Sequence, residues 1–195
     1  VVYKAVHVPT MTIVAVKQVF ENESENLRLM RHELTLLPTF YALREVNALR
    51  ELQYANGDNM IPNILQVYDV YTEPDLRCVS MVLEYMSWGS LDDIFVRHRR
   101  RLTEPQLAHI AHSCLLALSE LKRRRLVHRD IKPSNILMDH HGRVKLSDFG
   151  VMTEFRDGMK SLSKTFTGTL AFMSPERITS GCGIGDETYS YPADV

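Results

Sequence analysis

The stretch "VHRDIKPSNIL", residues 127–137, gathers histidine, arginine, aspartate, lysine and asparagine into eight consecutive positions, 128–135. Apolar residues stand beside and among them: Val127, Ile131 and Ile136. A solvated loop would lack the apolar neighbours, and a core strand would lack the charges. The combination indicates a functional site.

A second motif, "VKLSDFG" at residues 144–150, follows shortly. Its apolar pattern predicts a strand that ends at Asp148, and a turn at residues 139–142 would fold it back onto "NILM". That hairpin would bring Asn135 and Asp148 close together. An amide oxygen and a carboxylate that converge in this way suit Mg²⁺, which binds one or two protein carboxylates and keeps several waters.

Two charged residues of the first motif complete this chemistry. Asp130, five residues before Asn135, would project toward the same place as an acid that the metal does not use. Lys132 would supply a cation for a developing phosphate charge. A metal-binding pair, a base and a cation together predict phosphoryl transfer.

The N-terminal residues 1–19 contain a further candidate for this site, Lys17. Residues 1–8 and 12–19 are rich in Val and Ile and are separated by a Pro-Thr turn, which predicts an antiparallel hairpin. In the second strand Ala15 and Lys17 would share one face. Lys17 could equally be an edge-strand lysine, and the strand pattern alone leaves both interpretations open.

The middle of the chain is predicted to alternate between helix and strand. Residues 21–55 read as mostly helical, with a new helix opening near Pro38. Residues 64–86 read as two strands with a turn at residues 73–75, and "WGSLDDIF" reads as a glycine break before a short helix.

A longer helix is predicted after Thr103, which has Gln106 at the spacing of a capping box. Its expected apolar stripe consists of Leu107, Ile110, Ala111, Cys114, Leu118 and Leu121. His109 and His112 on the same helix have no evident third ligand, so we expect surface or cap histidines and not a metal pair.

The composition excludes several classes of protein. Of 195 residues 45% are hydrophobic, which is enough for a core, and a net charge of −1 gives no overall attraction to nucleic acid or to an anionic membrane. The three cysteines are widely spaced and form no Cys-x-x-Cys pair, which argues against a zinc module or a disulfide framework and favours a reducing, cytoplasmic location. No apolar run approaches the length of a membrane span.

These motifs resemble those of eukaryotic protein kinases. The pattern His-Arg-Asp-x-Lys-x-x-Asn, followed by Asp-Phe-Gly, carries the resemblance. It implies that Asp130 is the catalytic base and that Lys132 contacts the γ-phosphate of ATP. By the same resemblance Asn135 and Asp148 bind Mg²⁺, and Glu176 in "MSPE" is the structural acid that closes the activation loop.

The resemblance also assigns residues to the nucleotide. Lys17 in "VAVK" is similar to the strand lysine that holds the α- and β-phosphates. The other implied contacts are Val2, Ala15, Leu83, Glu84, Met86 and Leu137, with Leu83 as gatekeeper in the hinge-like "LEYM". A helical glutamate should pair with Lys17. We favour Glu45 in "LREVNALREL" for this role, and Glu33 in "RHELTLL" remains the alternative.

The stretch "DFGVMTEFRDGMKSLSKTFTGTLAFMSPERI" resembles the activation segment of MAP kinase kinases. Ser161 and Thr165 occupy the positions that receive activating phosphates in that group. Each phosphate would add a charge of about −1.5 to −2, which could order the loop against a cation such as Arg129. The resemblance implies a MAP kinase as substrate, phosphorylated on Thr and Tyr, and an upstream MAP kinase kinase kinase as activator.

The implied fold is α+β, a protein kinase-like bilobal fold that is incomplete at both ends. Residues 1–86 would form the β-rich small lobe, with one main helix and the hinge but without the glycine-rich loop. Residues 87–195 would form the first part of the mainly helical large lobe, ending where Asp194 resembles the first anchor of its core helix. Two alternatives remain: a kinase of another tier of the cascade, and a catalytically silent kinase-like scaffold.

Overall fold

The computed structural model describes residues 1–20, 61–73, 78–98, 101–149, 153–154, 169–175, 177–178 and 194. The chain divides into two compact units. The N-terminal unit comprises Val1–Met60 and Leu65–Met86, and the C-terminal unit comprises Ile61–Ile64 and Ser87–Val195.

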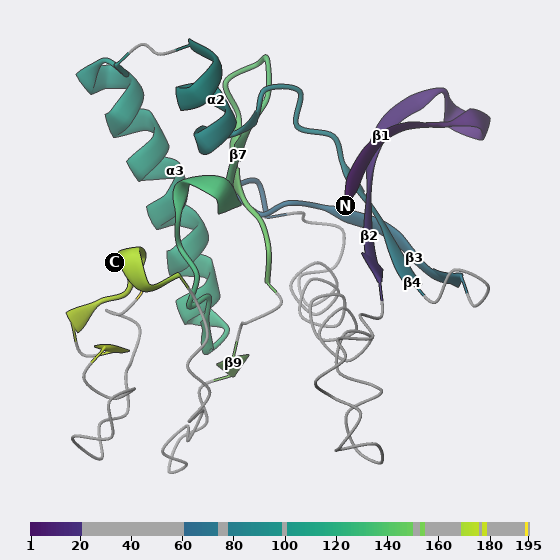
Figure 1. The fold of residues 1–195 in the computed structure, drawn as a ribbon. Coiled ribbons are helices and arrows are strands. Elements are labelled where there is room, and N and C mark those ends of the chain that lie inside the picture. Colours follow the sequence, from purple (N-terminus) through teal and green to yellow (C-terminus); the bar gives the residue numbers. More distant parts are fainter. Residues whose placement is uncertain are drawn as a thin grey trace. The chain divides into compact units, whose positions relative to one another are not determined.

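The described part of the N-terminal unit is a four-stranded sheet (Figure 1). Its strands are β1 (Val2–His7), β2 (Thr12–Phe20), β3 (Val67–Glu73) and β4 (Cys78–Glu84). They lie in the order β1-β2-β4-β3, and each neighbouring pair is antiparallel. Valine, isoleucine and tyrosine recur in these strands because branched and aromatic side chains pack well on a pleated surface. The strands predicted within residues 1–19 and 64–86 are confirmed.

The turn between β1 and β2 is a short 3-10 helix, η1 (Val8–Thr10). Pro9 stands in its first turn, where its missing N–H costs no hydrogen bond. Met11 then closes the turn in the left-handed conformation, with φ of 52°, and its N–H donates to the Val8 carbonyl at 3.3 Å.

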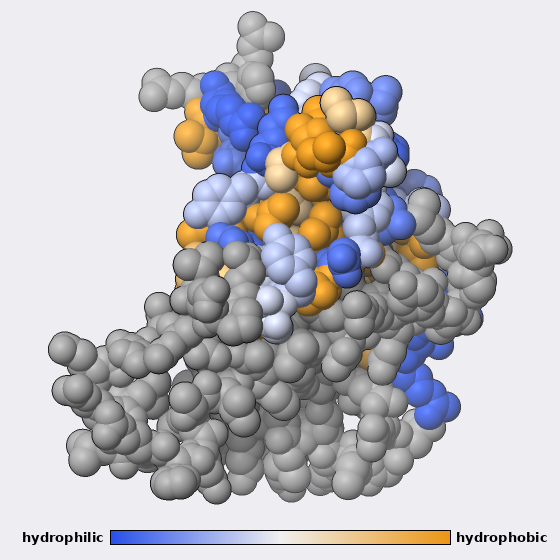
Figure 2. Space-filling view, turned by 90° about the vertical axis from the view of Figure 1, so that its right-hand side faces the viewer, coloured by the Kyte–Doolittle hydropathy of each residue, from blue (hydrophilic) through white to orange (hydrophobic). Residues whose placement is uncertain are grey.

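Apolar side chains gather around this turn on the solvent side. Figure 2 faces the side of the molecule that carries the hairpin and shows orange patches among hydrophilic residues. The exposed apolar residues of the hairpin end are Val6, Val8, Met11 and Ile13. These residues are not part of the core. Strand β4 contributes to the core of this unit instead, because its Val79, Met81 and Leu83 are all buried.

The described part of the C-terminal unit combines two helices with short strands. The helices are α2 (Leu91–His98) and α3 (Glu104–Arg123), and the 3-10 turns are η4 (Pro133–Asn135) and η5 (Leu170–Phe172). One sheet has the order β5 (Gly89–Ser90), β7 (Ile136–Met138) and β8 (Val144–Leu146). A second pair joins β6 (Leu126–Val127) to β9 (Thr153–Glu154). Helix α3 packs against β6 and β8, and these strands carry the first residues of the motifs at residues 127–137 and 144–150.

Helix α3 begins as predicted. The backbone N–H of Thr103 donates to the Gln106 side chain at 2.9 Å, and Pro105 stands in the first turn. Lys122 and Arg123 end the helix, where cations interact favourably with its dipole.

The predicted apolar stripe of α3 is only partly correct. Leu107 is 51% exposed and Ala111 is also exposed, whereas the buried positions are Ile110, Ser113, Ala117 and Leu121. The packed face therefore runs through small residues, which let the helix approach its neighbours closely. A pattern based on hydrophobicity alone passes over a buried serine.

The helices predicted at residues 21–55 lie outside the described residues. No helix among the described residues is long and apolar enough to cross a membrane. His109 and His112 on α3 are both exposed, and the ring of His109 bonds to the Gly142 carbonyl at 2.8 Å, which fits an ordinary surface histidine.

Candidate active site

Strand β6 leads directly into the charged segment at residues 128–135. Leu126 and Val127 are buried, and His128 follows with no exposed surface. The backbone N–H groups of His128 and Arg129 both donate to the carboxylate of Asp194, at 2.6 and 2.7 Å. This carboxylate thus fixes the start of the loop that carries Asp130.

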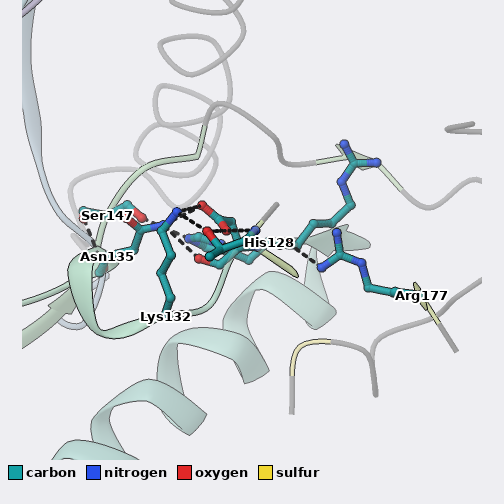
Figure 3. Close-up of polar contacts among 8 residues, drawn as sticks. His128, Lys132, Asn135, Ser147 and Arg177 are labelled. Carbon is teal, nitrogen blue, oxygen red and sulfur yellow. Dashed lines mark hydrogen bonds and ion pairs between the residues drawn. The ribbon is translucent and has the colours of Figure 1, made fainter. Parts of the chain in front are cut away.

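Several polar contacts converge on the carboxylate of Asp130, and Figure 3 labels two of its partners, Lys132 and Asn135. Lys132 Nζ lies 2.7 Å from Asp130 Oδ2 and also donates to the Thr169 hydroxyl at 2.8 Å. Asn135 Nδ2 donates to the same Oδ2 at 3.0 Å, and the Thr169 backbone N–H donates to Oδ1 at 3.2 Å. Three of the residues named from the sequence therefore meet within hydrogen-bonding distance.

This network determines the charge of Asp130. Burial raises the pKa of its carboxyl, but the hydrogen bond and charge of Lys132, with hydrogen bonds from Asn135 and Thr169, lower it by more. The pKa therefore lies below its ordinary value. Asp130 is an anion at neutral pH, so it can accept a hydrogen bond from an incoming hydroxyl group.

The hairpin β7–β8 brings the second motif to this network. Ile136 pairs with Leu146, and the Ser147 N–H and hydroxyl both donate to the Asn135 carbonyl, at 2.9 and 3.0 Å. Asp148 comes next in the chain and has a left-handed backbone, with φ of 64°. Such strain in a residue other than glycine is concentrated at functional sites.

Asn135 and Asp148 carry the side-chain oxygens that the family resemblance assigns to a metal ion. Both hydrogens of the Asn135 amide are directed at Asp130, to its carbonyl at 2.8 Å and its carboxylate at 3.0 Å, which leaves Oδ1 as the amide's ligand atom. Within the described ranges no group of three or more His, Cys, Asp or Glu side chains could hold a metal. The donor set fits Mg²⁺, which takes few protein ligands and completes its shell with phosphate and water.

The buried side chain of His128 contacts the loop that carries Asp130. Burial lowers its pKa, despite the carboxylates of Asp194, Asp148 and Asp130 around it, so the ring is neutral. The Asp130 N–H lies 3.3 Å from Nδ1 and the Ser147 carbonyl lies 3.1 Å from Nε2, which assigns the ring proton to Nε2. The ring also contacts Phe149, with 4.9 Å between centroids.

The N-terminal unit carries most of the residues assigned to the nucleotide by resemblance. Strand β2 pairs with β1 on one side and β4 on the other, so Lys17 lies on a central strand, opposite Val2 and Met81. The edge-lysine interpretation is wrong. Ala15 pairs with Leu83, and alternation places Ala15 and Lys17 on one face of the sheet.

The hinge-like segment follows directly from β4. Leu83, Glu84 and Met86 are all buried, and the Glu84 N–H donates to the Gln66 carbonyl at 2.9 Å. Leu137, the remaining residue assigned to the nucleotide, lies in β7 opposite Lys145 and is half-buried.

Some predicted site residues lie outside the described residues, and some described contacts escaped prediction. Glu45, Glu33, Ser161, Thr165 and Glu176 are outside the described ranges. Thr169 had no predicted contact with Asp130, although it stands in the motif "FTGT" after the activation-segment positions. Arg177 had no predicted role, and its guanidinium donates to the Arg129 carbonyl. No local pattern marks either contact, because the partners are 39 and 48 residues apart.

Comparison with known proteins matches this chain to one family. The family described as "Protein kinase domain" matches residues 1–195. The chain is 36% identical, over all of its length, to mitogen-activated protein kinase kinase 3 of Arabidopsis thaliana, and covers 33% of that protein. It is 37% identical to MAP kinase kinase MKK1/SSP32 of Saccharomyces cerevisiae, over 80% of this chain and 31% of that protein.

A third relative, mitogen-activated protein kinase kinase 1 of Arabidopsis thaliana, is 33% identical over 92% of this chain and 50% of its own length. The chain thus spans between 31% and 50% of the length of these curated relatives.

Proposed function

Because this chain belongs to the protein kinase domain family, we propose that it is part of an ATP-dependent protein kinase of the MAP kinase kinase type. The observation that carries the proposal is the network in which Lys132, Asn135 and Thr169 surround the anionic Asp130 carboxylate. A carboxylate held in this way beside a cation is equipped to orient a hydroxyl nucleophile.

In the proposed reaction a hydroxyl oxygen of a protein substrate attacks the γ-phosphorus of ATP. A bond forms between that oxygen and the phosphorus, and the bond from the phosphorus to the β,γ-bridging oxygen breaks, releasing ADP. Asp130 accepts the hydrogen bond of the attacking hydroxyl and takes its proton. Lys132, 2.7 Å from Asp130, stabilises negative charge on the transferred group.

The nucleotide is held by residues that the family resemblance assigns. Lys17 binds the α- and β-phosphates, and Val2, Ala15, Leu83, Glu84, Met86 and Leu137 contact the base. Asn135 and Asp148 hold Mg²⁺, which neutralises phosphate charge when it is bound. Glu45 pairs with Lys17. The support for these roles is the match of each residue to its family motif.

The proposed substrate is a MAP kinase, because the similar proteins are named as kinases of MAP kinases. An upstream kinase would activate the protein by phosphorylating Ser161 and Thr165. We place the protein in the cytoplasm, because its three widely spaced cysteines form no Cys-x-x-Cys pair and fit a reducing compartment.

Phosphotransfer by the full-length protein tests the proposal. The protein would carry Ser161→Glu and Thr165→Glu to imitate activation, the acceptor would be a catalytically dead MAP kinase, and Asp130→Asn would be the control. We expect phosphate on a Thr and a Tyr of the acceptor, mapped by mass spectrometry, and a loss of at least 100-fold in the control.

A second acceptor, a catalytically dead kinase of the tier below, separates the competing functions. Transfer to Ser and Thr of a kinase from the tier below, without tyrosine modification, would indicate a kinase of another tier. Binding of ATP and Mg²⁺ without transfer to the acceptor, and without release of phosphate, would indicate a silent scaffold.

A further inference from the structure

Two side chains, those of Asp194 and Arg177, form hydrogen bonds with the backbone just before Asp130. The N–H groups of His128 and Arg129 donate to Asp194, as described above. At the same peptide segment, Arg177 Nη1 donates to the Arg129 carbonyl (Figure 3). Arg177 is 8% exposed, so this hydrogen bond lies in the interior.

This segment needs to be held because its conformation is unfavourable. Arg129 has φ of 71°, in the left-handed region, and it is not glycine. A residue with a Cβ in that region costs roughly 1–2 kcal/mol. Such a conformation persists only where surrounding contacts determine it.

The orientation of the Arg129 carbonyl also affects the orientation of the Asp130 side chain. Its peptide plane contains the Asp130 N–H, which donates to His128 Nδ1 at 3.3 Å. Rotation of that plane would turn the Asp130 side chain away from Lys132 and Thr169. The contact to Arg177 therefore bears on the orientation of the catalytic carboxylate.

We propose that Arg177 is a positioning residue: by binding the Arg129 carbonyl it holds Arg129 in the left-handed conformation and so orients Asp130 for catalysis. The inference rests on the proposed function, since it concerns how the catalytic carboxylate is oriented. Thr169 precedes Arg177 by eight residues and also bonds to Asp130. The segment after the proposed phosphorylation sites thus makes two contacts here, one with the Asp130 side chain and one with the backbone carbonyl of the preceding Arg129.

Kinetics of variants in the full-length, Ser161→Glu and Thr165→Glu protein test this role. We expect Arg177→Met to lower kcat roughly 10- to 100-fold, because a small misplacement of a reacting group has effects of this size. KM for ATP should change less than threefold, since the guanidinium of Arg177 bonds to the Arg129 carbonyl, and Arg129 is not assigned to the nucleotide. Arg177→Lys keeps a donor and a charge, so it should recover part of kcat.

The matched control is Arg101→Met, which removes an exposed arginine of the same unit. It should leave kcat, KM and the melting temperature unchanged. A merely structural role for Arg177 would lower the melting temperature and leave kcat per folded molecule intact. That result, or equal kcat in Arg177→Met and in the unaltered protein, would overturn the inference.

A second measurement does not depend on activity. Amide hydrogen exchange of the peptide that contains residues 127–131 reports how often this segment opens. Exchange there should quicken in Arg177→Met while exchange in α3 stays the same, and unchanged exchange would overturn the inference. If the unaltered protein transferred no phosphate, the proposed function would fail, and the exchange result would still decide the role of Arg177.

Discussion

At the scale of single residues, one lysine controls the charge state of the proposed base. Lys132 is the largest of the influences that lower the pKa of Asp130, against the opposing effect of burial. Because burial would then dominate, Lys132→Met should raise that pKa. Activity that depends on ionised Asp130 is present above the pKa and is lost as the pH falls through it.

The acid limb of the kcat/KM profile therefore tests this relation. In the unaltered protein it should lie below the ordinary aspartate value of about 4, and in Lys132→Met it should move toward neutral pH. Phosphotransfer measured from pH 4 to 8 should therefore show no acid limb from Asp130 in the unaltered protein, and an acid limb inside this range in Lys132→Met. An acid limb that stays in place in the variant would show that Lys132 does not control the ionisation of Asp130.

At the scale of elements, two glycines make a matched pair of turns. Both have left-handed backbones, Gly89 with φ of 75° and Gly142 with φ of 76°. A Cβ on Gly142 would meet nothing within 4 Å, whereas a Cβ on Gly89 would lie 2.7 Å from Asp93 Oδ2. That oxygen is not free to move without loss, because it accepts from the Ser90 N–H and hydroxyl at 2.9 and 2.7 Å.

Alanine at each position should therefore have unequal costs. Gly142→Ala should lower the free energy of unfolding by roughly 1–2 kcal/mol, the cost of the left-handed backbone alone. Gly89→Ala should lose about 1–3 kcal/mol more, because the bonds that Asp93 makes at the start of α2 are displaced. Urea denaturation of the two variants measures the difference, and equal losses would mean that Asp93 shifts without cost.

The end of α3 carries a pH-dependent contribution to stability. Glu120 Oε1 lies 2.7 Å from Arg123 Nη2 and 2.6 Å from Arg124 Nε. The hydrogen bond from Arg123 is the largest cause that lowers the pKa of Glu120, from its ordinary 4.5 to about 2, with burial opposing it. The folded pKa lies below the unfolded one, so the stabilisation is present above pH 4.5 and disappears as the pH falls toward 2.

Glu120→Gln should accordingly destabilise the protein by roughly 1–3 kcal/mol at pH 7. The difference from the unaltered protein should shrink as the pH is lowered from 4.5, because protonation removes the same charge. Unfolding free energies at pH 7 and pH 3.5 make this comparison. A gap that is equally large at both values would contradict the proposed ionic origin.

At the scale of the whole molecule, the sequence predicts what is locally encoded. The β1–β2 hairpin follows from alternation and a proline turn, and the start of α3 follows from Thr103 and Gln106, because each depends on neighbours in the chain. The buried face of α3 was predicted less well, since Ser113 and Ala117 are buried by close packing and not by hydrophobicity. The contacts of Thr169 and Arg177 join distant segments, so only the folded chain reveals them.

If Mg²⁺ is bound only by the two assigned oxygen ligands and the nucleotide, its removal should affect phosphotransfer activity but not the stability of the fold. Among the residues that the structure describes, no cluster of His, Cys, Asp and Glu could hold a structural metal. Mg²⁺ would instead be bound with the nucleotide, by Asn135, Asp148 and phosphate oxygens. EDTA in excess should therefore abolish phosphotransfer and leave the melting temperature of the nucleotide-free protein unchanged.

Added Mg²⁺ should restore turnover, and with ATP it should raise the melting temperature, because a ligand that binds only the folded state stabilises it. Asp148→Asn should lose that rise. A melting temperature that falls in EDTA without nucleotide would instead point to a metal that the fold itself requires.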